Sequence, residues 1–371
     1  MSKLIYYQLI AICCLSLNAC SSVNQNSHIN AQQLEPHQAH YKTLTHLNWP
    51  ELTMDRALLA TQHSPIISNI RSRLIALNDL SYYKITQANY YDNTLKTGVK
   101  RFQLRHGLKA DGVIGKTTLK QLNISPNLRL QQLNQALSDW QALPDMNGNK
   151  EYMHVNLASY QLSIYQGLQI NLKMNVVVGS PSWPTPTLNS EIKTIVVNPT
   201  WNVPKSITER ELIHKIVDNA DYLQEENITV VDGWHKDAKQ IDPASIDWAS
   251  YIGNAELPYR LVQGAGDLNA LGKIKFTFPN TEHVYLHDTP NKAAFTLTKR
   301  NVSHGCIRLE QPIALLNYLF KHERLNKPEA ITEQLALGEK TRHYALKQAL
   351  PIYISHISAW VDEQGLLNFR N

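Results

Sequence analysis

Cysteine is scarce in this sequence, which contains only four among 371 residues. Three of the four lie within the first twenty residues, so Cys306 is the single thiol in the body of the chain. One thiol cannot form an internal disulfide, which excludes the disulfide framework of small secreted proteins. If the body is exported to an oxidising compartment, Cys306 is either buried and inert or reactive.

Charged residues are also sparse, at 18% of the chain, and the net charge is only +5. The Lys and Arg residues are scattered without a dense run or stripe, which argues against nucleic acid as a partner. The hydrophobic share of 43% is ordinary for a globular protein. A length of 371 residues corresponds to two or three domains.

One short apolar run, Leu4 to Leu17, lies near the N-terminus behind Lys3. It is too short to span a bilayer comfortably and is typical of a signal peptide. The run ends in Leu17-Asn18-Ala19-Cys20, which resembles the lipobox of bacterial lipoproteins. We therefore expect residues 1–19 to be a cleaved lipoprotein signal and Cys20 to be lipidated. A cleaved signal without lipid and an uncleaved anchor are the alternatives.

Lipidation of Cys20 would hold the protein in the periplasm on a membrane tether, because several acyl chains anchor stably where one does not. Ser21 after the cysteine resembles lipoproteins sent to the outer membrane. The following residues are rich in Gln, Asn, His and Ser with little apolar periodicity. We therefore predict a flexible tether over residues 20–64.

Helical periodicity begins near residue 65. Apolar residues recur three apart at Leu74 and Leu77, and again at Leu95, Val99 and Phe102 with the i, i+4, i+7 spacing of a helix. The pattern predicts a small helical bundle over residues 65–124, followed by a linker helix over 125–150. The bundle resembles the three-helix peptidoglycan-binding domain of the first type, on the residues Val99, Phe102-Gln103, Gly107-Leu108, Asp111-Gly112, Gly115 and Thr118-Leu119.

From Tyr152 the apolar period changes to two, which predicts strands. Further short apolar runs occur at 195–197, 274–278 and 284–286. A polar stretch over about 205–262 interrupts them and predicts an insertion that covers the sheet. The expected fold class is α+β multidomain, with a β-rich domain over 151–371 behind the helical bundle.

The segment 303–309, Ser-His-Gly-Cys-Ile-Arg-Leu, contains the lone thiol of the body. A thiol is nucleophilic as the thiolate, so it needs a base or a cation close by. His304 and His287 are both candidates for that base. Gly305 would let a substrate carbonyl approach the backbone, whose N–H groups could hold an oxyanion. A buried structural thiol is the plainer alternative for Cys306.

A metal site is a rival interpretation for His283 and His287, because an H-x-x-x-H spacing on a helix can bind one ion. The intervening Val284-Tyr285-Leu286 favours a strand instead. Along a strand the two rings would start about 13 Å apart, which is too far for one ion. We therefore expect no metal.

The region from about Met153 onwards resembles the catalytic domain of L,D-transpeptidases of the YkuD type. The resemblance rests on motifs in the family's order, namely 184–186 (PTP), 198–204 (NPTWNVP), 269–272 (NALG) with Lys275-Phe276, 285–289 (YLHDT) and 303–309. Larger members also contain a peptidoglycan-binding module, a capping subdomain where residues 205–262 lie here, and similar strands near the C-terminus.

This resemblance implies that Cys306 is the nucleophile and His287 the general base. A backbone carbonyl would orient the His287 ring, and Asp288 is the candidate for it. Ser303, His304 and Gly305 would support the site, and Arg308 would brace it or meet a substrate carboxylate. No cofactor is implied.

The implied reaction is attack on a tetrapeptide stem of peptidoglycan, between its third residue and the terminal D-alanine. Transfer of the resulting thioester to another stem would form a 3-3 cross-link and serve cell wall organisation and cell shape. Transfer to water, a carboxypeptidase activity, and transfer to a lipoprotein remain alternatives. The rival outside enzymology is a non-catalytic lipoprotein that binds the wall. The family also implies sensitivity to carbapenems.

Overall fold

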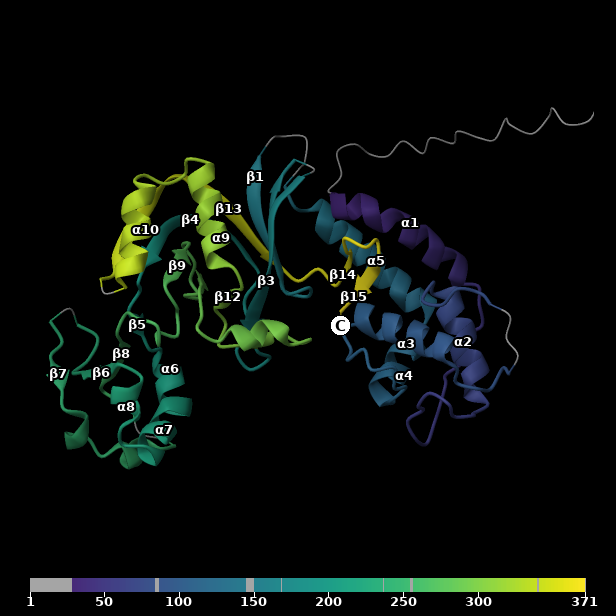
Figure 1. The fold of residues 1–371 in the computed structure, drawn as a ribbon, viewed down its shortest axis with the longest axis horizontal. Coiled ribbons are helices and arrows are strands. Elements are labelled where there is room, and N and C mark those ends of the chain that lie inside the picture. The colour runs from purple at the N-terminus through teal and green to yellow at the C-terminus, as the bar shows by residue number, and fades with distance from the viewer. Residues whose placement is uncertain are drawn as a thin grey trace, which may run out of the picture.

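The computed structural model describes residues 29–83, 87–144, 150–167, 169–235, 237–253, 256–338 and 340–370. The predicted signal peptide and Cys20 lie outside these residues. Figure 1 shows three parts, a helical region, a sheet with two covering helices, and a smaller mixed subdomain below that sheet. Within the described ranges, none of the helices has the length and apolar character that crossing a bilayer requires.

The helical bundle forms where its apolar period predicts it. The buried faces of its three helices meet in one core that includes Leu74, Leu95, Val99 and Phe102. Asp92 caps the middle helix by accepting a hydrogen bond from the N–H of Leu95 at 2.7 Å. The helices are α2 (Ile66–Ala76), α3 (Asn93–Arg105) and α4 (Lys116–Asn123).

A further helix precedes the bundle. Residues 29–44, which the sequence analysis assigned to a flexible tether, form helix α1 (Ile29–Leu44), which packs along α5 (Pro126–Gln141). Ala31 and Leu34 of α1 are fully buried in the core that these two helices share. Residues 29–44 therefore belong to the folded body. Burial of apolar side chains orders this segment, although its composition did not suggest an ordered structure.

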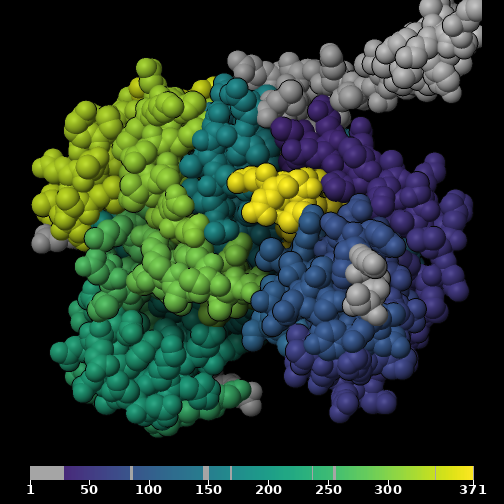
Figure 2. All heavy atoms as spheres, turned by 45° about the vertical axis from the view of Figure 1, so that its right-hand side comes forward, coloured from purple at the N-terminus to yellow at the C-terminus, as the bar shows by residue number. Residues whose placement is uncertain are grey.

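A C-terminal hairpin completes that shared core. Its strands are β14 (Ala359–Val361) and β15 (Leu367–Phe369), and Ala359 and Phe369 are buried among residues of α1 and α5. Figure 2 shows this hairpin in yellow between the helical region and the sheet. The helical region is thus attached to the β-rich domain through an apolar interface.

The β-rich domain is built on a nine-stranded sheet in the order β11-β3-β12-β10-β9-β4-β13-β1-β2. Strand β2 also pairs with β3, so the sheet closes on itself. Its first strand, β1, runs parallel to the late strand β13. The strands are β1 (Glu151–Asn156), β2 (Gln161–Gln166), β3 (Gln169–Gly179), β4 (Leu188–Val197), β9 (Ile274–Thr277), β10 (Leu286–His287), β11 (Asn301–Ser303), β12 (Ile307–Leu309) and β13 (Arg342–Ser355).

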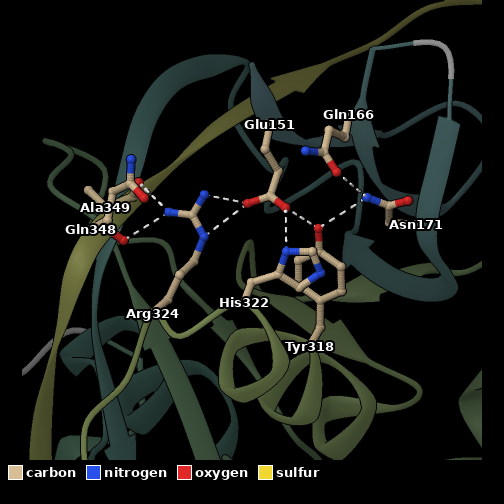
Figure 3. Close-up of polar contacts among 8 residues, drawn as sticks. All are labelled: Glu151, Gln166, Asn171, Tyr318, His322, Arg324, Gln348 and Ala349. Atoms are coloured by element: carbon tan, nitrogen blue, oxygen red, sulfur yellow. Dashed lines mark hydrogen bonds and ion pairs between the residues drawn. The ribbon is translucent and has the colours of Figure 1, made fainter. Parts of the chain in front are cut away.

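Helices α9 (Pro312–Lys321) and α10 (Pro328–Leu337) cover the sheet and share its core. A polar network joins the end of α9 to the strands, as Figure 3 shows. The carboxylate of Glu151 on β1 accepts hydrogen bonds from Tyr318 and Arg324. The Arg324 guanidinium also donates to the carbonyl oxygens of Gln348 and Ala349 on β13, both at 3.0 Å. The short 3-10 helix η4 (Lys292–Thr296) precedes β11.

The predicted insertion folds as a subdomain with its own core, which includes Val203, Ile213, Val230 and Leu261. We call residues 201–263 the cap. Its four strands form a separate small sheet in the order β5-β8-β6-β7. The elements are β5 (Trp201–Asn202), α6 (Lys205–Ile207), the π-helix η1 (Thr208–Leu212), α7 (Ile213–Asp218), α8 (Tyr222–Glu225), β6 (Ile228–Val231), β7 (Gln240–Ile241), η2 (Pro243–Ser245), η3 (Trp248–Tyr251) and β8 (Arg260–Gln263). The predicted α+β multidomain class is confirmed.

Candidate active site

Cys306 lies in the tight turn between β11 and β12 and is half-buried. The turn needs a glycine before the cysteine, because Gly305 has φ +107°. The Ser303 hydroxyl donates to the carbonyl of Cys306 at 2.6 Å and accepts from the N–H of Gly305 at 3.2 Å. Ser303 therefore holds the turn. The N–H of Gly305 donates to this hydroxyl.

His287 is placed beside the cysteine by strand pairing. Strands β10 and β12 are parallel neighbours, with Leu286 opposite Ile307 and His287 opposite Arg308. Leu286 and Ile307 are fully buried in the core, so the alternating residues Tyr285, His287, Cys306 and Arg308 share the other face. Cys306 and His287 are thus diagonal neighbours on one face. From sequence, the separation of nineteen positions between His287 and Cys306 could only suggest this arrangement.

The His287 ring is buried and held in one tautomer. Its Nδ1–H donates to the carbonyl oxygen of Asp288 at 2.5 Å, the partner that the family resemblance implied. Burial, together with the positive charge of Arg308, lowers the pKa of His287 to about 3. The imidazole is therefore neutral at physiological pH, and its Nε2 is an unprotonated acceptor.

Asp288 holds its own carbonyl in place through its side chain. Its carboxylate accepts from the N–H of Lys273 at 3.0 Å and from Nζ of Lys292 at 2.7 Å. It also fills the space beside Gly272, where an added Cβ would lie 2.4 Å from the Asp288 carboxyl group. Gly272 has φ +61°. This bracing fixes the backbone that orients His287.

Tyr285 and Lys275 surround the thiol, and sequence reasoning did not assign either to the site. Burial raises the pKa of the Cys306 thiol, while hydrogen bonds with Tyr285 and the charge of Lys275 act in the opposite direction. Nζ of Lys275 lies 3.5 Å from the centroid of the Tyr285 ring. The effect of burial on the pKa is the larger one, so the resting thiol is protonated. We expected a base to generate thiolate, whereas the thiol and the His287 imidazole are both neutral at rest.

His304 lies against the cap. Its Nε2 is 2.5 Å from Oε1 of Glu211, which belongs to η1 of the cap. The Trp183 ring lies edge-on to the His304 ring at 5.5 Å, and the Arg210 guanidinium lies 4.7 Å from the Trp183 ring. His304 therefore has a carboxylate partner of its own, which favours His287 over His304 as the base. Glu211 was missed because 93 residues separate it from His304.

Arg308 and Thr185 complete the surroundings of the thiol. Nε of Arg308 is buried without a hydrogen-bond partner among the described residues, and burial lowers the pKa of Arg308. The Thr185 hydroxyl donates to the carbonyl of Gly305 at 2.7 Å and accepts from the N–H of Gly179 at 2.8 Å. Thr185 thus fixes the turn from behind. Its only signal in the sequence was the motif Pro184-Thr185-Pro186.

Comparisons with known proteins match both halves of the chain. Residues 150–324 match the family model YkuD, described as the L,D-transpeptidase catalytic domain. Residues 72–122 match the model described as "Putative peptidoglycan binding domain". A curated Haemophilus influenzae protein named "Putative L,D-transpeptidase" is 33% identical over 251 residues, which are 68% of this chain and 48% of that protein. The chain thus spans about half the length of that relative.

Solved structures also resemble the chain, at low scores. The L,D-transpeptidase from Mycobacterium smegmatis is 14% identical with a TM-score of 0.26, over 56% of this chain and 59% of that one. An L,D-transpeptidase from Stackebrandtia nassauensis is 13% identical with a TM-score of 0.27, over 80% of this chain and 96% of that one. With TM-scores this low, we infer nothing about function from these two structures. The inference of function rests on the family match and on the geometry of the site.

Proposed function

The chain belongs to the YkuD family through its residues 150–324, and from this premise we propose that it is an L,D-transpeptidase acting through a thioester on Cys306. The observation that carries the proposal is the state of His287. Its Nδ1–H is held by the carbonyl of Asp288, which leaves Nε2 as the ring nitrogen that can accept a proton. A base in this state, diagonal to a cysteine on one sheet face, suits a thiol that is protonated at rest.

The reaction proceeds in two acyl transfers. The proton of the Cys306 thiol passes to Nε2 of His287, and the sulfur attacks the carbonyl carbon of the third stem residue. The C–N bond to the terminal D-alanine then breaks, and the departing amine takes the proton from His287. An acceptor amine next loses a proton to His287 and attacks the thioester. This step forms the new amide and returns the thiol.

Two further groups suit the charges that develop. The N–H of Gly305 is occupied by Ser303, which leaves the N–H of Cys306 as the backbone donor for the oxyanion. Arg308 presents a guanidinium whose Nε lacks a partner within the described residues. A carboxylate of the substrate would pair with this guanidinium. Arg308 is therefore assigned to substrate binding and Ser303 to support of the turn.

The preferred acyl acceptor is the side-chain amine of a second stem, which gives a 3-3 cross-link. A cap that reaches the loop of the nucleophile through Glu211 favours an enclosed site, and enclosure favours an amine over water. Hydrolysis and lipoprotein attachment use the same chemistry and are the alternative outcomes. The alternative, a non-catalytic lipoprotein that binds the wall, does not explain why the His287 ring is held in one orientation.

The deciding experiment is incubation of the purified protein with defined disaccharide tetrapeptides, followed by mass spectrometry of the products. Dimers with loss of D-alanine would support cross-linking, and shortened tripeptides would indicate hydrolysis. If no product is formed, the proposal is overturned. As a second readout, a carbapenem should add once per chain on the peptide that contains Cys306, and Cys306→Ala should abolish the adduct.

We also propose that the protein works in the periplasm, anchored through lipid on Cys20 and directed to the outer membrane. Support comes from the sequence Leu17-Asn18-Ala19-Cys20-Ser21. The wild-type protein should partition with membranes, and Cys20→Ala should release it to the soluble periplasmic fraction. A wild-type protein recovered wholly in the soluble fraction would refute the anchor.

A further inference from the structure

A long groove runs where the helical region meets the catalytic domain. A cavity of about 490 Å³ lies between the two parts, with His106 and Lys120 on the helical side and Tyr160 and Ser180 on the catalytic side. A second cavity of about 390 Å³ continues it along the helical region. The two cavities share the lining residues Gly107, Leu108, Thr117, Thr298 and Lys299. Figure 2 shows the seam along which the two parts meet.

The groove is basic. Lys109, Lys120, Lys299 and Arg370 line it, and Asp111 is the one acidic residue among the described lining residues. Lys109 lies 3.9 Å from Asp111, while the other three cations form no ion pair within the described part of the chain. Unpaired cations gathered along one channel favour an anionic ligand.

Arg370 is the most informative of these cations. It lies against Gly107, where an added Cβ would be 2.5 Å from its Nε, and this Nε is buried without a hydrogen-bond partner among the described residues. A buried guanidinium is costly unless a charge or hydrogen bonds compensate it. Within the described residues it donates to the carbonyl oxygens of Arg105 at 3.1 Å and Phe369 at 2.8 Å, and its guanidinium lies 5.1 Å from the centroid of the Trp360 ring. A carboxylate entering the groove would supply an opposite charge that the described residues do not place beside it.

The two walls of the groove are fixed to each other. Arg105 of the bundle donates to the carbonyl of Leu367 in the hairpin at 3.4 Å, and Gln132 of α5 donates to the carbonyl of Arg370 at 2.9 Å. The apolar core shared by α1, α5 and the hairpin lies behind these contacts. The groove is therefore preformed, so a ligand need not order it on binding.

The groove also reaches the back of the catalytic turn. Gly179 and Thr185 line it, and Thr185 donates to the carbonyl of Gly305, the residue before the nucleophile. A chain bound along the groove would thus run from the helical region to the loop of Cys306. A ligand with charged groups at intervals would match both the length and the charge.

We propose that this groove binds a peptidoglycan strand through the carboxylates of its stem peptides, on both domains at once. The inference rests on the proposed function for the identity of the polymer. Stems not being processed would lie along the groove, and they would hold the strand while a neighbouring stem reaches Cys306. The groove would therefore determine affinity for the assembled wall more than for a single short stem.

The test is binding of the full chain to intact peptidoglycan sacculi, measured by co-sedimentation over a range of salt concentrations. The Cys306→Ala background removes turnover from the measurement. The groove variant is Lys120→Glu with Lys299→Glu, one position on each wall. The matched control is Lys100→Glu with Lys321→Glu, which makes the same charge change at exposed positions of the same two parts outside the groove. Thermal denaturation checks that both variants are folded.

We expect the groove variant to lose about tenfold in affinity for sacculi and the control to change less than about twofold. Equal binding by the two variants would overturn the groove as the site. Equal binding of wild type to sacculi and to glycan strands stripped of their peptides would overturn the carboxylates as the ligand. If wild type converts muropeptides yet does not bind sacculi, the groove fails and the proposed activity stands. If the protein binds sacculi but converts no muropeptide, the proposed activity is overturned and the proposed binding in the groove stands.

Discussion

The catalytic domain has two neighbours, and they are attached to it in opposite ways. The helical region shares an apolar core with the C-terminal hairpin, to which α1, α5, β14 and β15 all contribute. The cap keeps its apolar residues in a core of its own and meets the nucleophile loop through polar groups. The first attachment has the character of a domain interior, and the second resembles a contact that can be made and broken.

One ion pair inside the helical region and one where the cap meets the catalytic domain differ in burial. Asp79 and Arg105 form a doubly hydrogen-bonded pair with side chains only 1% and 4% exposed. Glu211 and His304 form a pair with side chains 40% and 28% exposed. Breaking a buried pair leaves an uncompensated charge, whereas an exposed pair contributes little to stability. The helical region should therefore matter for folding, and the cap for events at the site.

If the two neighbours differ only in how they are attached, the residues that carry out muropeptide turnover should all lie in the catalytic domain. Cys306→Ser should lower muropeptide turnover by at least about 10⁴-fold, since a serine hydroxyl is much less acidic than a thiol. His287→Ala should lose about 10²- to 10⁴-fold, the usual contribution of a general base. Appreciable turnover by the serine variant would contradict the thiolate mechanism. A larger loss in His304→Ala than in His287→Ala would reverse the assignment of the base.

The next effect tests the helical side. Asp79→Ala should lower the free energy of unfolding by about 3 kcal/mol, because Arg105 would keep a buried charge without its partner. Denaturant titration followed by tryptophan fluorescence would measure it. The control, Asp218→Ala at an exposed position of the cap, should change stability by less than about 0.5 kcal/mol. Similar losses in both variants would show that the buried pair of the helical region contributes no more to stability than an exposed residue of the cap.

The cap side should show a smaller effect, and on activity. Glu211→Gln removes the charge opposite His304 while keeping the shape of the side chain. We expect about a two- to fivefold loss in kcat/KM, as for a partly exposed pair, with an unchanged denaturation midpoint. Exchange of the exposed Glu225 of the same subdomain for Gln serves as the control. A stability loss like that of Asp79→Ala would mean that the cap is fastened as firmly as the helical region.

The smallest effect is a shift in a pH profile. The pKa of Cys306 is raised by burial, so alkylation by iodoacetamide should rise with pH through a midpoint above the free-thiol value of about 8.5. Tyr285→Phe should move this midpoint higher, because its hydrogen bond to the sulfur favours thiolate. Glu211→Gln should leave the midpoint in place. A midpoint below the free-thiol value would show a preformed thiolate.

The sequence predicted those parts of the molecule that depend on local patterns. Periodicity located the helices of the bundle, and the motif around Cys306 located the turn in which this cysteine lies. Helix α1 was missed because it is polar, contains Pro36 and becomes ordered through a few buried residues such as Leu34. Local patterns cannot report such long-range packing.

The same limit applies to the site. Glu211 reaches His304 across 93 positions, and Tyr285 and Lys275 meet Cys306 only after three strands have paired. The raised pKa of the thiol depends on burial, which is a property of the folded domain. Motifs could therefore name Cys306 and His287 as candidates but not predict their protonation states.

The parallel pairing of β1 with β13 has a consequence for how the protein acquires its structure. Met153 lies opposite Ile352, so the first strand of the catalytic domain waits for a partner synthesised 199 residues later, the difference between 352 and 153. Contacts this distant slow folding, because a long loop must close before they form. The sheet therefore closes only after β13 has been synthesised, whereas strands β10 and β12 beside Cys306 pair with each other and with β9 and β3, which all precede β13 in the chain.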